Sequence, residues 1–266
     1  MESNTKLYKY LDFKGGLSML HYGNLQFTNS TRLNDPFDCH PGLFDFSNVP
    51  VKTDDGFLRD FFKEKGRLDT ENLRNKAWIC SLSKIHDSVP MWAYYANHEG
   101  VCIGVNMEKA RKYLSRILCS IYQGAMEMEV QYREVVERPK PDYYHNEVDY
   151  FRYLFSTKAK AWEHEQEVRL VLIDPIPASD YNNSYYAPMG LPYKTKRNDS
   201  IDWREVRAYP RLGVECFESL YLGIKIDKEE KVRIIKEARR CNPEIKIYQM
   251  KIDPEAIRLK EQLIEL

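Results

Sequence analysis

The sequence predicts an α+β fold, built on a mostly antiparallel and split sheet with peripheral helices. Segments with strand-like patterns outnumber helical ones, and the helices lack the regular alternation with strands that a parallel α/β fold needs. The chain has 266 residues, of which 43% are hydrophobic, so it can form a large core. The Pro-Lys-Pro kink at 139–141 looks like an internal connection. We therefore expect a single domain over 1–266, with its core at roughly 6–252.

The first half of the chain predicts four strands, separated by short helices and loops. The alternating run KLYKYL is typical of a strand, and the short helix after it ends at Gly23, since glycine is favoured just past a helix. The polar amphipathic region 55–75 predicts two short helices. Pro90 suits the first turn of a helix that ends at Gly100. The four strands are expected at 6–11, 24–29, 77–83 and 101–107.

The second half predicts five further strands. The segments CSIYQG and MEVQYREV look like the two arms of a hairpin, and the tyrosine-rich run 142–160 reads as a long helix that leads into the strand EVRLVLI. The segment 175–199 is rich in Pro, Asn, Ser and Tyr, which is typical of a long loop or flap. The strands are expected at 119–124, 128–135, 167–173, 218–226 and 244–252, and the other helices at 108–115 and 228–240.

Composition and cysteine spacing exclude several classes of protein. Forty basic and forty acidic residues cancel, so no global field draws the chain to nucleic acid or to a membrane. No segment approaches the roughly 18 apolar residues of a membrane span, and the first residues lack the apolar run of a leader, so we expect a cytoplasmic protein. The six cysteines contain no C-x-x-C pair and the six histidines are dispersed, which favours reduced thiols and no metal site.

The run KAKAWEHEQEVRLVLID carries the strongest candidate chemistry. Strand alternation places Glu165, Glu167 and Arg169 on one face, and Val168 with two leucines on the other. Two carboxylates on one face resist joint ionisation, which permits acid or base work near neutral pH, and carboxylates also stabilise developing positive charge. The alternative is a solvated pair that is held by Arg169. Lys158 and Trp162 could hold a ligand or simply finish the preceding helix.

Two further segments supply candidate binding groups. In LNDPFDC, Asn34 and Asp35 precede a proline and predict a turn with free backbone donors, to which Asp38 adds a carboxylate; a plain structural turn is the alternative. In VPMWAYYANHEG, the rings of Trp92 and Tyr95 could wall a planar ligand, or belong to the core. The chain contains no G-x-G-x-x-G, P-loop or G-x-S-x-G motif, so a Rossmann site and a nucleophile elbow are not expected.

Three blocks of the chain resemble a bacterial family, the domain of unknown function 2971. They are LYKYLDF…GNLQFTNSTRLNDPFDC, ICSLSK…VPMWAYYANHEGVCIGV and KAKAWEHEQEVRLV…LYLG, and they span roughly Leu7 to Gly223. More distantly, the order of these blocks is similar to that of ADP-ribosyltransferases, especially the DarT-like toxins that modify DNA. That second resemblance implies a split sheet that holds NAD without a Rossmann fold.

The resemblance to ADP-ribosyltransferases also implies roles for individual residues. The run Leu7-Tyr8-Lys9 stands where those enzymes have a histidine or arginine that contacts the nicotinamide-ribose part of NAD, so Lys9 departs from their pattern. Glu165-x-Glu167 at the start of a strand is similar to their E/Q-x-E motif, which makes Glu167 the catalytic carboxylate and Glu165 its orienting partner. The binding residues expected around them are Lys9, Tyr10, Asn34, Asp35, Ser81, Ser83, Trp92 and Tyr95.

The resemblance implies an enzyme that cleaves the nicotinamide–ribose bond of NAD. It would transfer ADP-ribose to nucleic acid or another target, or act as an NAD glycohydrolase, in the setting of a toxin or of phage defence. A second hypothesis is a sensor module that binds a nucleotide-like molecule or a partner without chemistry. A third is another hydrolase that uses Glu165 and Glu167 as an acid/base pair; their short spacing makes a glycosidase the weakest of the three.

Overall fold

The computed structural model describes residues 6–46, 55–117, 126–136, 147–173, 202–203 and 206–265. Over these residues the chain is α+β, with several helices around an open sheet, which confirms the predicted α+β class and the mostly antiparallel pairing. The helices are α1 (Phe13–Tyr22), α2 (Gly56–Asn75), α3 (Val89–Ala96), α4 (Met107–Ile117), α5 (Glu147–Ser156) and α6 (Lys228–Cys241).

The large sheet contains eleven strands in the order β13-β12-β11-β4-β1-β3-β2-β10-β9, and β8 and β5 branch from the other edge of β3. Among the described strands of this sheet, only the β11–β12 pairing is parallel. A separate parallel pair joins β6 to β7. The strands are β1 (Lys6–Leu11), β2 (Phe27–Asn29), β3 (Ala77–Ser83), β4 (Val101–Asn106), β5 (Met126–Glu129), β6 (Gln131–Arg133), β7 (Thr157–Ala159), β8 (Glu167–Ile173), β9 (Asp202–Trp203), β10 (Arg207–Tyr209), β11 (Phe217–Leu222), β12 (Lys246–Ile252) and β13 (Leu259–Leu263).

The sheet forks along one edge of β3. At the end of β3, Ser83 pairs with Tyr8 of β1. Nearer its start, Ile79 and Trp78 pair with β2. β1 itself pairs with β4 along its whole length, so β1 and β2 leave β3 in different directions and a gap opens beside Ser81. On its other edge β3 is paired with β8 from Ala77 to Ser83, without interruption.

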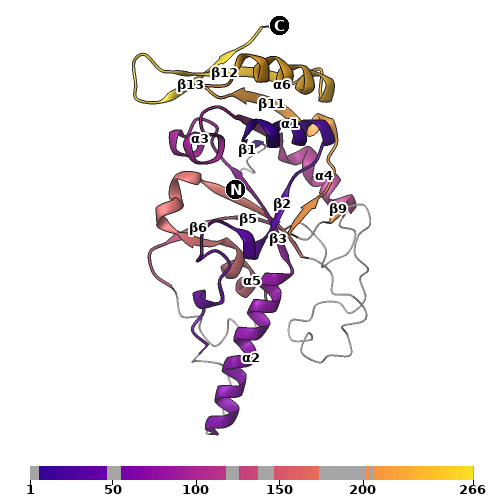
Figure 1. The fold of residues 1–266 in the computed structure, drawn as a ribbon. Coiled ribbons are helices and arrows are strands. Elements are labelled where there is room, and N and C mark those ends of the chain that lie inside the picture. Colours follow the sequence, from indigo (N-terminus) through magenta and orange to yellow (C-terminus); the bar gives the residue numbers. More distant parts are fainter. Residues whose placement is uncertain are drawn as a thin grey trace.

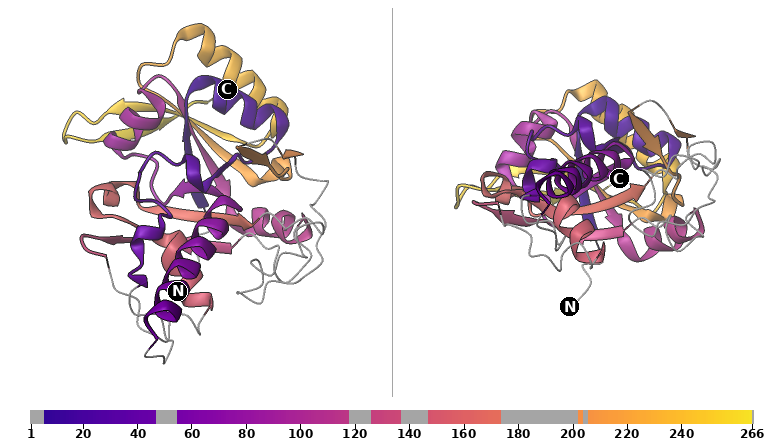
Figure 2. Two further views of the ribbon diagram at one scale, coloured as in Figure 1. Left: turned by 60° about the horizontal axis from the view of Figure 1, so that its bottom comes forward. Right: turned by 90° about the horizontal axis from the view of Figure 1, so that it is seen from below.

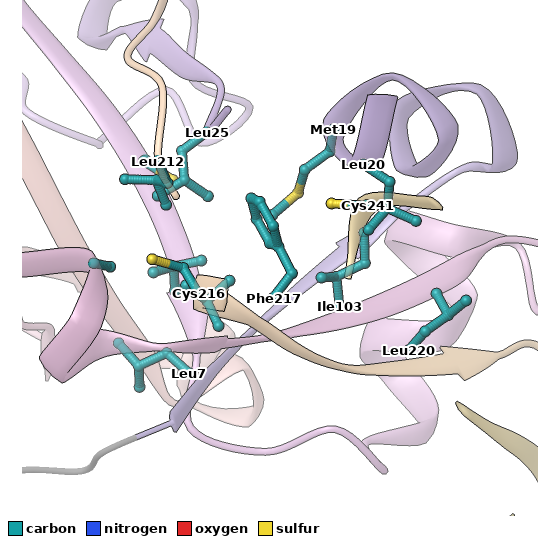
Figure 3. Close-up of a cluster of buried hydrophobic side chains, with 14 of the residues drawn as sticks. Leu7, Met19, Leu20, Leu25, Ile103, Leu212, Cys216, Phe217, Leu220 and Cys241 are labelled. Carbon is teal, nitrogen blue, oxygen red and sulfur yellow. The ribbon is translucent and has the colours of Figure 1, made fainter. Parts of the chain in front are cut away.

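One face of the sheet is covered by α1, α4 and α6. Its core joins Leu7, the apolar side chains of β4 and β11, and the buried stripe of α6. Figure 3 shows Phe217 of β11 beside Met19 of α1 in this core. The helices α1 and α6 lie side by side at the top of Figure 1, and Figure 2 shows the same pair from two further directions.

The opposite face carries two separate apolar clusters. Near the C-terminal strands, α3 packs its Trp92 and Met91 against Tyr10 and Tyr221. Toward the other end of the sheet, α5 packs its Leu154 against β3 and β8. The fork of the sheet is bordered by these two clusters, because β1 contributes to the first and β3 to the second.

Local capping explains several helix ends that the sequence predicted. The Asp12 carboxylate accepts a 2.6 Å hydrogen bond from the Gly15 backbone at the start of α1, and Gly23 ends that helix in the left-handed conformation, at φ 59°. Ser88 caps α3, whose first turn contains Pro90 as predicted. The helix ends at Ala96 rather than Gly100, because Asn97 already adopts the left-handed conformation.

The structure corrects three expectations about elements. Residues 56–75 form one helix, α2, that projects from the body of the molecule (Figure 1), where two short helices were expected. The expected long helix over 142–160 ends at Ser156, and β7 and a 3₁₀ helix (Lys160–Glu165) follow it. The expected second arm of a hairpin forms two short strands with other partners. Its β5 pairs with β8, and its β6 pairs with β7.

Two expected segments, the first hairpin arm at 119–124 and the loop at 175–199, lie outside the described residues. The strands β9, β10 and β13 were not predicted. None of the described helices combines the length and the apolarity that crossing a membrane requires. The five cysteines in the described ranges are free and buried, as their spacing predicted.

Candidate functional site

A cavity of about 170 Å³ lies in the fork of the sheet and brings most of the predicted site together. Its walls come from β1, from the loop after β2, from β3, from α3 and from the segment that leads into β8. The predicted site residues that line it are Lys9, Tyr10, Asn34, Ser81, Ser83, Tyr95, Glu165 and Glu167. Segments more than 150 residues apart in the chain therefore meet at one place.

Asp35 and Trp92, also predicted to bind a ligand, lie outside this lining and support it instead. Asp35 is buried, and its Oδ1 accepts a 2.9 Å hydrogen bond from the Phe37 backbone, which fixes the turn that presents Asn34. Trp92 is fully buried, donates its ring N–H to the His86 carbonyl at 2.8 Å, and packs edge-on against Tyr10. Both side chains hold neighbouring segments in place without lining the cavity.

Lys158 of β7 bridges the two predicted catalytic acids. Its Nζ donates to Oε2 of Glu165 and, at 3.0 Å, to Oε2 of Glu167. All three side chains are buried, with exposed fractions of 2–4%. The solvated pair that the sequence left open is thus excluded: the acids share a cation inside the protein.

Arg169 holds Glu167 from the other side and adds a third acid, Asp38. Its Nε donates to Oε1 of Glu167 at 2.8 Å, and its Nη2 donates to Oε2 of Glu167 at 3.1 Å and to Asp38 at 2.8 Å. Its Nη1 donates to the Phe155 carbonyl at 3.1 Å. Arg169 is fully buried, so these bonds must replace all of its hydration.

The network fixes the charge state of Glu167. Burial raises the pKa of this carboxyl, but the charges of Arg169 and Lys158 outweigh burial and hold the pKa well below its usual range, with a smaller contribution from the Ser81 side chain. At Asp38 burial prevails instead and raises the pKa of the carboxyl, despite the nearby charges of Arg169 and Lys158. The sequence predicted that repulsion between the acids could raise the pKa of one of them. At Glu167 the cations prevail, so Glu167 is an anion at neutral pH rather than a proton donor.

A left-handed residue places the two acids together. Glu165 ends the 3₁₀ helix Lys160–Glu165, Gln166 adopts φ 42°, and β8 begins at Glu167. The alternation predicted for Glu167, Arg169 and Val168 is confirmed, because Val168 packs in the core on the opposite face. Glu165 lies before the strand, and the Gln166 conformation, not strand alternation, turns it toward Lys158.

Tyr95 links Glu165 to the exposed rim of the cavity. Its hydroxyl donates to Oε1 of Glu165 at 2.5 Å and accepts a 3.3 Å hydrogen bond from the Asn34 amide. Burial and the nearby Glu165 carboxylate raise the pKa of Tyr95, so its phenol keeps its proton at neutral pH. Asn34 is exposed, so this chain of hydrogen bonds reaches the solvent.

Side chains take the place of sheet hydrogen bonds at the fork. The Lys9 ammonium donates to the Ser81 carbonyl at 2.8 Å, across the gap between β1 and β3. The Ser83 hydroxyl donates to the Glu165 carbonyl at 2.7 Å and ties the end of β3 to the 3₁₀ helix. Because these groups line the cavity, its polar wall is built from the same bonds that hold the fork open.

Sequence reasoning gave no firm role to several residues of the site. For Lys158 the sequence allowed either a ligand-binding role or a place at the end of a helix. For Asp38 it indicated only a carboxylate close to the predicted turn. Arg169 was correctly expected to pair with the acids. Lys158 is distinguished by its place on the short buried strand β7. No local sequence pattern indicated this strand, because the preceding helix was expected to continue through it. The cavity is also lined by Tyr8, Thr28, Arg32, Leu33, Asp38, Ile79, Leu82, Met91 and Lys158.

Comparisons with known proteins agree with one of the two resemblances. A family model described as a protein of unknown function (DUF2971) matches residues 91–170. The match covers α3 from Met91 onward and the run from Lys158 to Leu170, and therefore includes the two acids, Tyr95 and Lys158. It supports the resemblance to that family. Comparisons with curated proteins and with solved structures gave no significant match.

Among the described residues, no cluster of three or more His, Cys, Asp or Glu side chains is arranged to hold a metal ion. The acids of the cavity instead face Lys158 and Arg169, which already supply the countercharge that a cation would bring. The arrangement can present negative charge and hydrogen-bond acceptors to a small polar ligand.

Proposed function

We propose that this protein is an ADP-ribosyltransferase-like enzyme that cleaves the nicotinamide–ribose bond of NAD. It transfers ADP-ribose to nucleic acid or another target, or to water. The observation that carries the proposal is the meeting of Lys9 and the Glu165–Glu167 pair in one cavity, because the resemblance implies that these groups share a single site. Asn34, a candidate from its turn sequence, lines the same cavity.

The electrostatics of the cavity suit this chemistry. Cleavage of the bond develops oxocarbenium character on the ribose, which a fixed carboxylate stabilises in a site that excludes water. Glu167 carries its charge at neutral pH because Arg169 and Lys158 keep its pKa low. Glu167 would therefore act as a fixed negative charge near the ribose, without first having to lose a proton.

The size of the cavity limits which part of NAD it holds. Its volume of about 170 Å³ is smaller than the roughly 300–1,000 Å³ of typical ligand pockets. That space accepts one ring-sized group at a time. We therefore assign the cavity to the ribosyl end beside the scissile bond, with the rest of the dinucleotide outside it.

Incubation with labelled NAD tests the proposal directly. Wild-type protein is compared with Glu165→Gln and Glu167→Gln, with single-stranded DNA, RNA and no acceptor in parallel. Glu163→Gln is the matched control, since Glu163 is exposed, in the same short helix and outside the cavity. We expect turnover by the wild type and the control, and a loss of about 100-fold or more in the cavity variants. Equal turnover by all four proteins would refute the proposal.

A second function, a sensor that binds a nucleotide-like molecule without chemistry, is favoured by one observation. Both oxygens of Glu167 already accept bonds from cations, and its side chain is only 2% exposed. This function predicts that ADP-ribose or NAD raises the Tm of the wild type and of Glu165→Gln alike, with no product formed. Formation of nicotinamide by the wild type alone would exclude it.

A further inference from the structure

The geometry points to a division of roles between the two acids. We propose that Glu165, approached through Tyr95, is the carboxylate that contacts a hydroxyl of the ligand, that Lys158 positions it, and that Glu167 anchors the buried cations. This proposal rests on the proposed function for its substrate, and it reverses the roles that the resemblance implied for the two glutamates.

Glu167 is the more completely occupied acid. Its Oε1 accepts from Nε of Arg169 at 2.8 Å, and its Oε2 accepts from Nη2 of Arg169 at 3.1 Å and from Lys158 at 3.0 Å. Hydrogen bonds between two charged partners are roughly twice as strong as neutral ones. A ligand that reached Glu167 would have to break an ion pair with the fully buried guanidinium of Arg169, which would then keep only Asp38 of its two described carboxylate partners.

Glu165 offers a bond that a ligand can replace. Its Oε2 is held by Lys158, but its Oε1 accepts only the neutral Tyr95 phenol among the bonds found in the described structure. A ligand hydroxyl can take the place of that phenol and donate to the same oxygen. The phenol oxygen keeps the 3.3 Å bond that it accepts from the exposed Asn34 amide, and its O–H turns to donate to the oxygen of the ligand hydroxyl. The exchange therefore costs no ion pair.

Lys158 sets the position of Glu165. Its Nζ joins Oε2 of both acids, lies 5.1 Å from the centre of the Trp162 ring, and is buried. A lysine held by two acids and a ring has little freedom, so Glu165 keeps one rotamer with Oε1 toward Tyr95. Without the ammonium, two neighbouring buried carboxylates would repel each other and one of them would bind a proton.

A matched set of tyrosine variants separates the two acids by kinetics. Tyr95→Phe removes the only hydroxyl found to contact the Glu165 carboxylate, and Tyr132→Phe removes the hydroxyl that accepts from the Glu167 backbone at 2.7 Å. With labelled NAD, we expect Tyr95→Phe to lower kcat by about 10-fold to 100-fold. Tyr94→Phe, at an exposed ring of the same helix, should retain wild-type kcat and KM. A larger kcat effect in Tyr132→Phe than in Tyr95→Phe would overturn the assignment.

The role of Lys158 is tested by the pH profile of turnover. In Lys158→Met we expect the acid limb of kcat to move to higher pH, because the pair of acids without its ammonium holds a proton more tightly and the site then lacks one negative charge. Lys158→Arg should move the limb back toward its wild-type position. Unchanged profiles in both variants would show that Lys158 does not position the acid.

Two measurements that need no turnover keep this proposal separate from the NAD chemistry. In urea, Glu167→Gln should unfold at a lower midpoint than Glu165→Gln, because only the former removes a carboxylate partner of the buried Arg169. With carboxyl-labelled glutamate, D-ribose should shift the NMR signal of Glu165 and not that of Glu167. If NAD is inert but both results hold, the proposed substrate fails and the division of roles stands. A ribose-induced shift at Glu167 alone, no shift at either acid, or the reverse order of midpoints would overturn the division.

Discussion

Lys9 donates a 2.8 Å hydrogen bond from its ammonium to the backbone carbonyl of Ser81. This bond spans the fork of the sheet, where β1 has left β3 and pairs with it only at Tyr8 and Ser83 among the described residues. A lysine side chain thus satisfies a strand carbonyl at the place where the cavity forms. The residue that the sequence selected for ligand binding also keeps the cavity open.

Replacement of Lys9 by Met should destabilise the protein by about 1 kcal/mol, the usual contribution of one hydrogen bond. The Ser81 carbonyl then faces the cavity, where water can replace part of the lost bond. Urea unfolding measures the change, and Lys14→Met, at an exposed position of α1, is the control. Equal midpoints for the two variants would mean that the bond contributes nothing to stability.

Loss of the buried guanidinium should be far more costly than loss of an exposed one. Arg169→Gln leaves Glu167 and Asp38 without their partner in the interior, and we expect a loss of about 3–5 kcal/mol. Arg111→Gln breaks a bond of nearly the same length, 2.7 Å to Glu127, but at the surface, so its cost should be about 0–1 kcal/mol.

Both arginine variants are compared with the wild type by guanidinium chloride unfolding. The pair matches in chemistry and in bond length and differs in burial, with 1% of the side chain exposed for Arg169 and 38% for Arg111. Similar costs for the two variants would contradict the assigned role of burial.

Glu167 should give the folded protein a marked sensitivity to acid. Its folded pKa is depressed, so its contribution to stability is complete above the unfolded pKa of about 4.3 and is lost as the pH falls toward the folded value. Asp38 has a raised pKa and acts in the opposite sense: its carboxyl favours the folded state as the pH falls.

Urea midpoints between pH 3 and pH 7 test this linkage. Below about pH 4.3 the wild type should lose stability more steeply than Glu167→Gln, because unfolding of the wild type then takes up one more proton. Glu163→Gln is the control, since Glu163 is exposed. Parallel curves for wild type and Glu167→Gln would show that the carboxyl titrates alike in the folded and unfolded states.

The left-handed conformation of Gln166 should matter more than its side chain. The side chain is exposed, while φ is 42°. Gln166→Val should cost about 2 kcal/mol, since a β-branched residue is strained in this region. Gln166→Gly should change stability by less than about 1 kcal/mol, because relief of strain offsets the greater freedom of the unfolded chain.

Thermal unfolding of the two Gln166 variants checks this expectation. Glu163→Val is the control, because Glu163 is exposed in the same segment and its φ is not positive. NAD turnover in the same variants reports whether the acids moved. If Gln166→Val is as stable and as active as Gln166→Gly, the conformation is not what brings Glu165 and Glu167 together.

Much of the fold follows from local patterns. The predicted strands 6–11, 77–83 and 167–173 match β1, β3 and β8, because alternating or continuous apolar runs between turns specify strands directly. The errors arose where tertiary contacts override local propensity. The helix expected to reach Lys160 stops at Ser156, since β7 pairs with β6 and places Lys158 among the acids.

The sequence by itself determined the kinds of side chain in the candidate site and the elements that carry them. These are two acids at a strand start, a lysine on the first strand and an Asn-Asp-Pro turn. Only the tertiary structure decided how they are used. Burial and hydrogen bonding depend on partners far away in the chain, as between Asp38 and Arg169 or between Lys158 and Glu167. Those partners fix Glu167 as a buried anion, because charge in a protein interior is set by the groups that surround it. Glu165 keeps one neutral hydrogen bond, from Tyr95, that a ligand can replace.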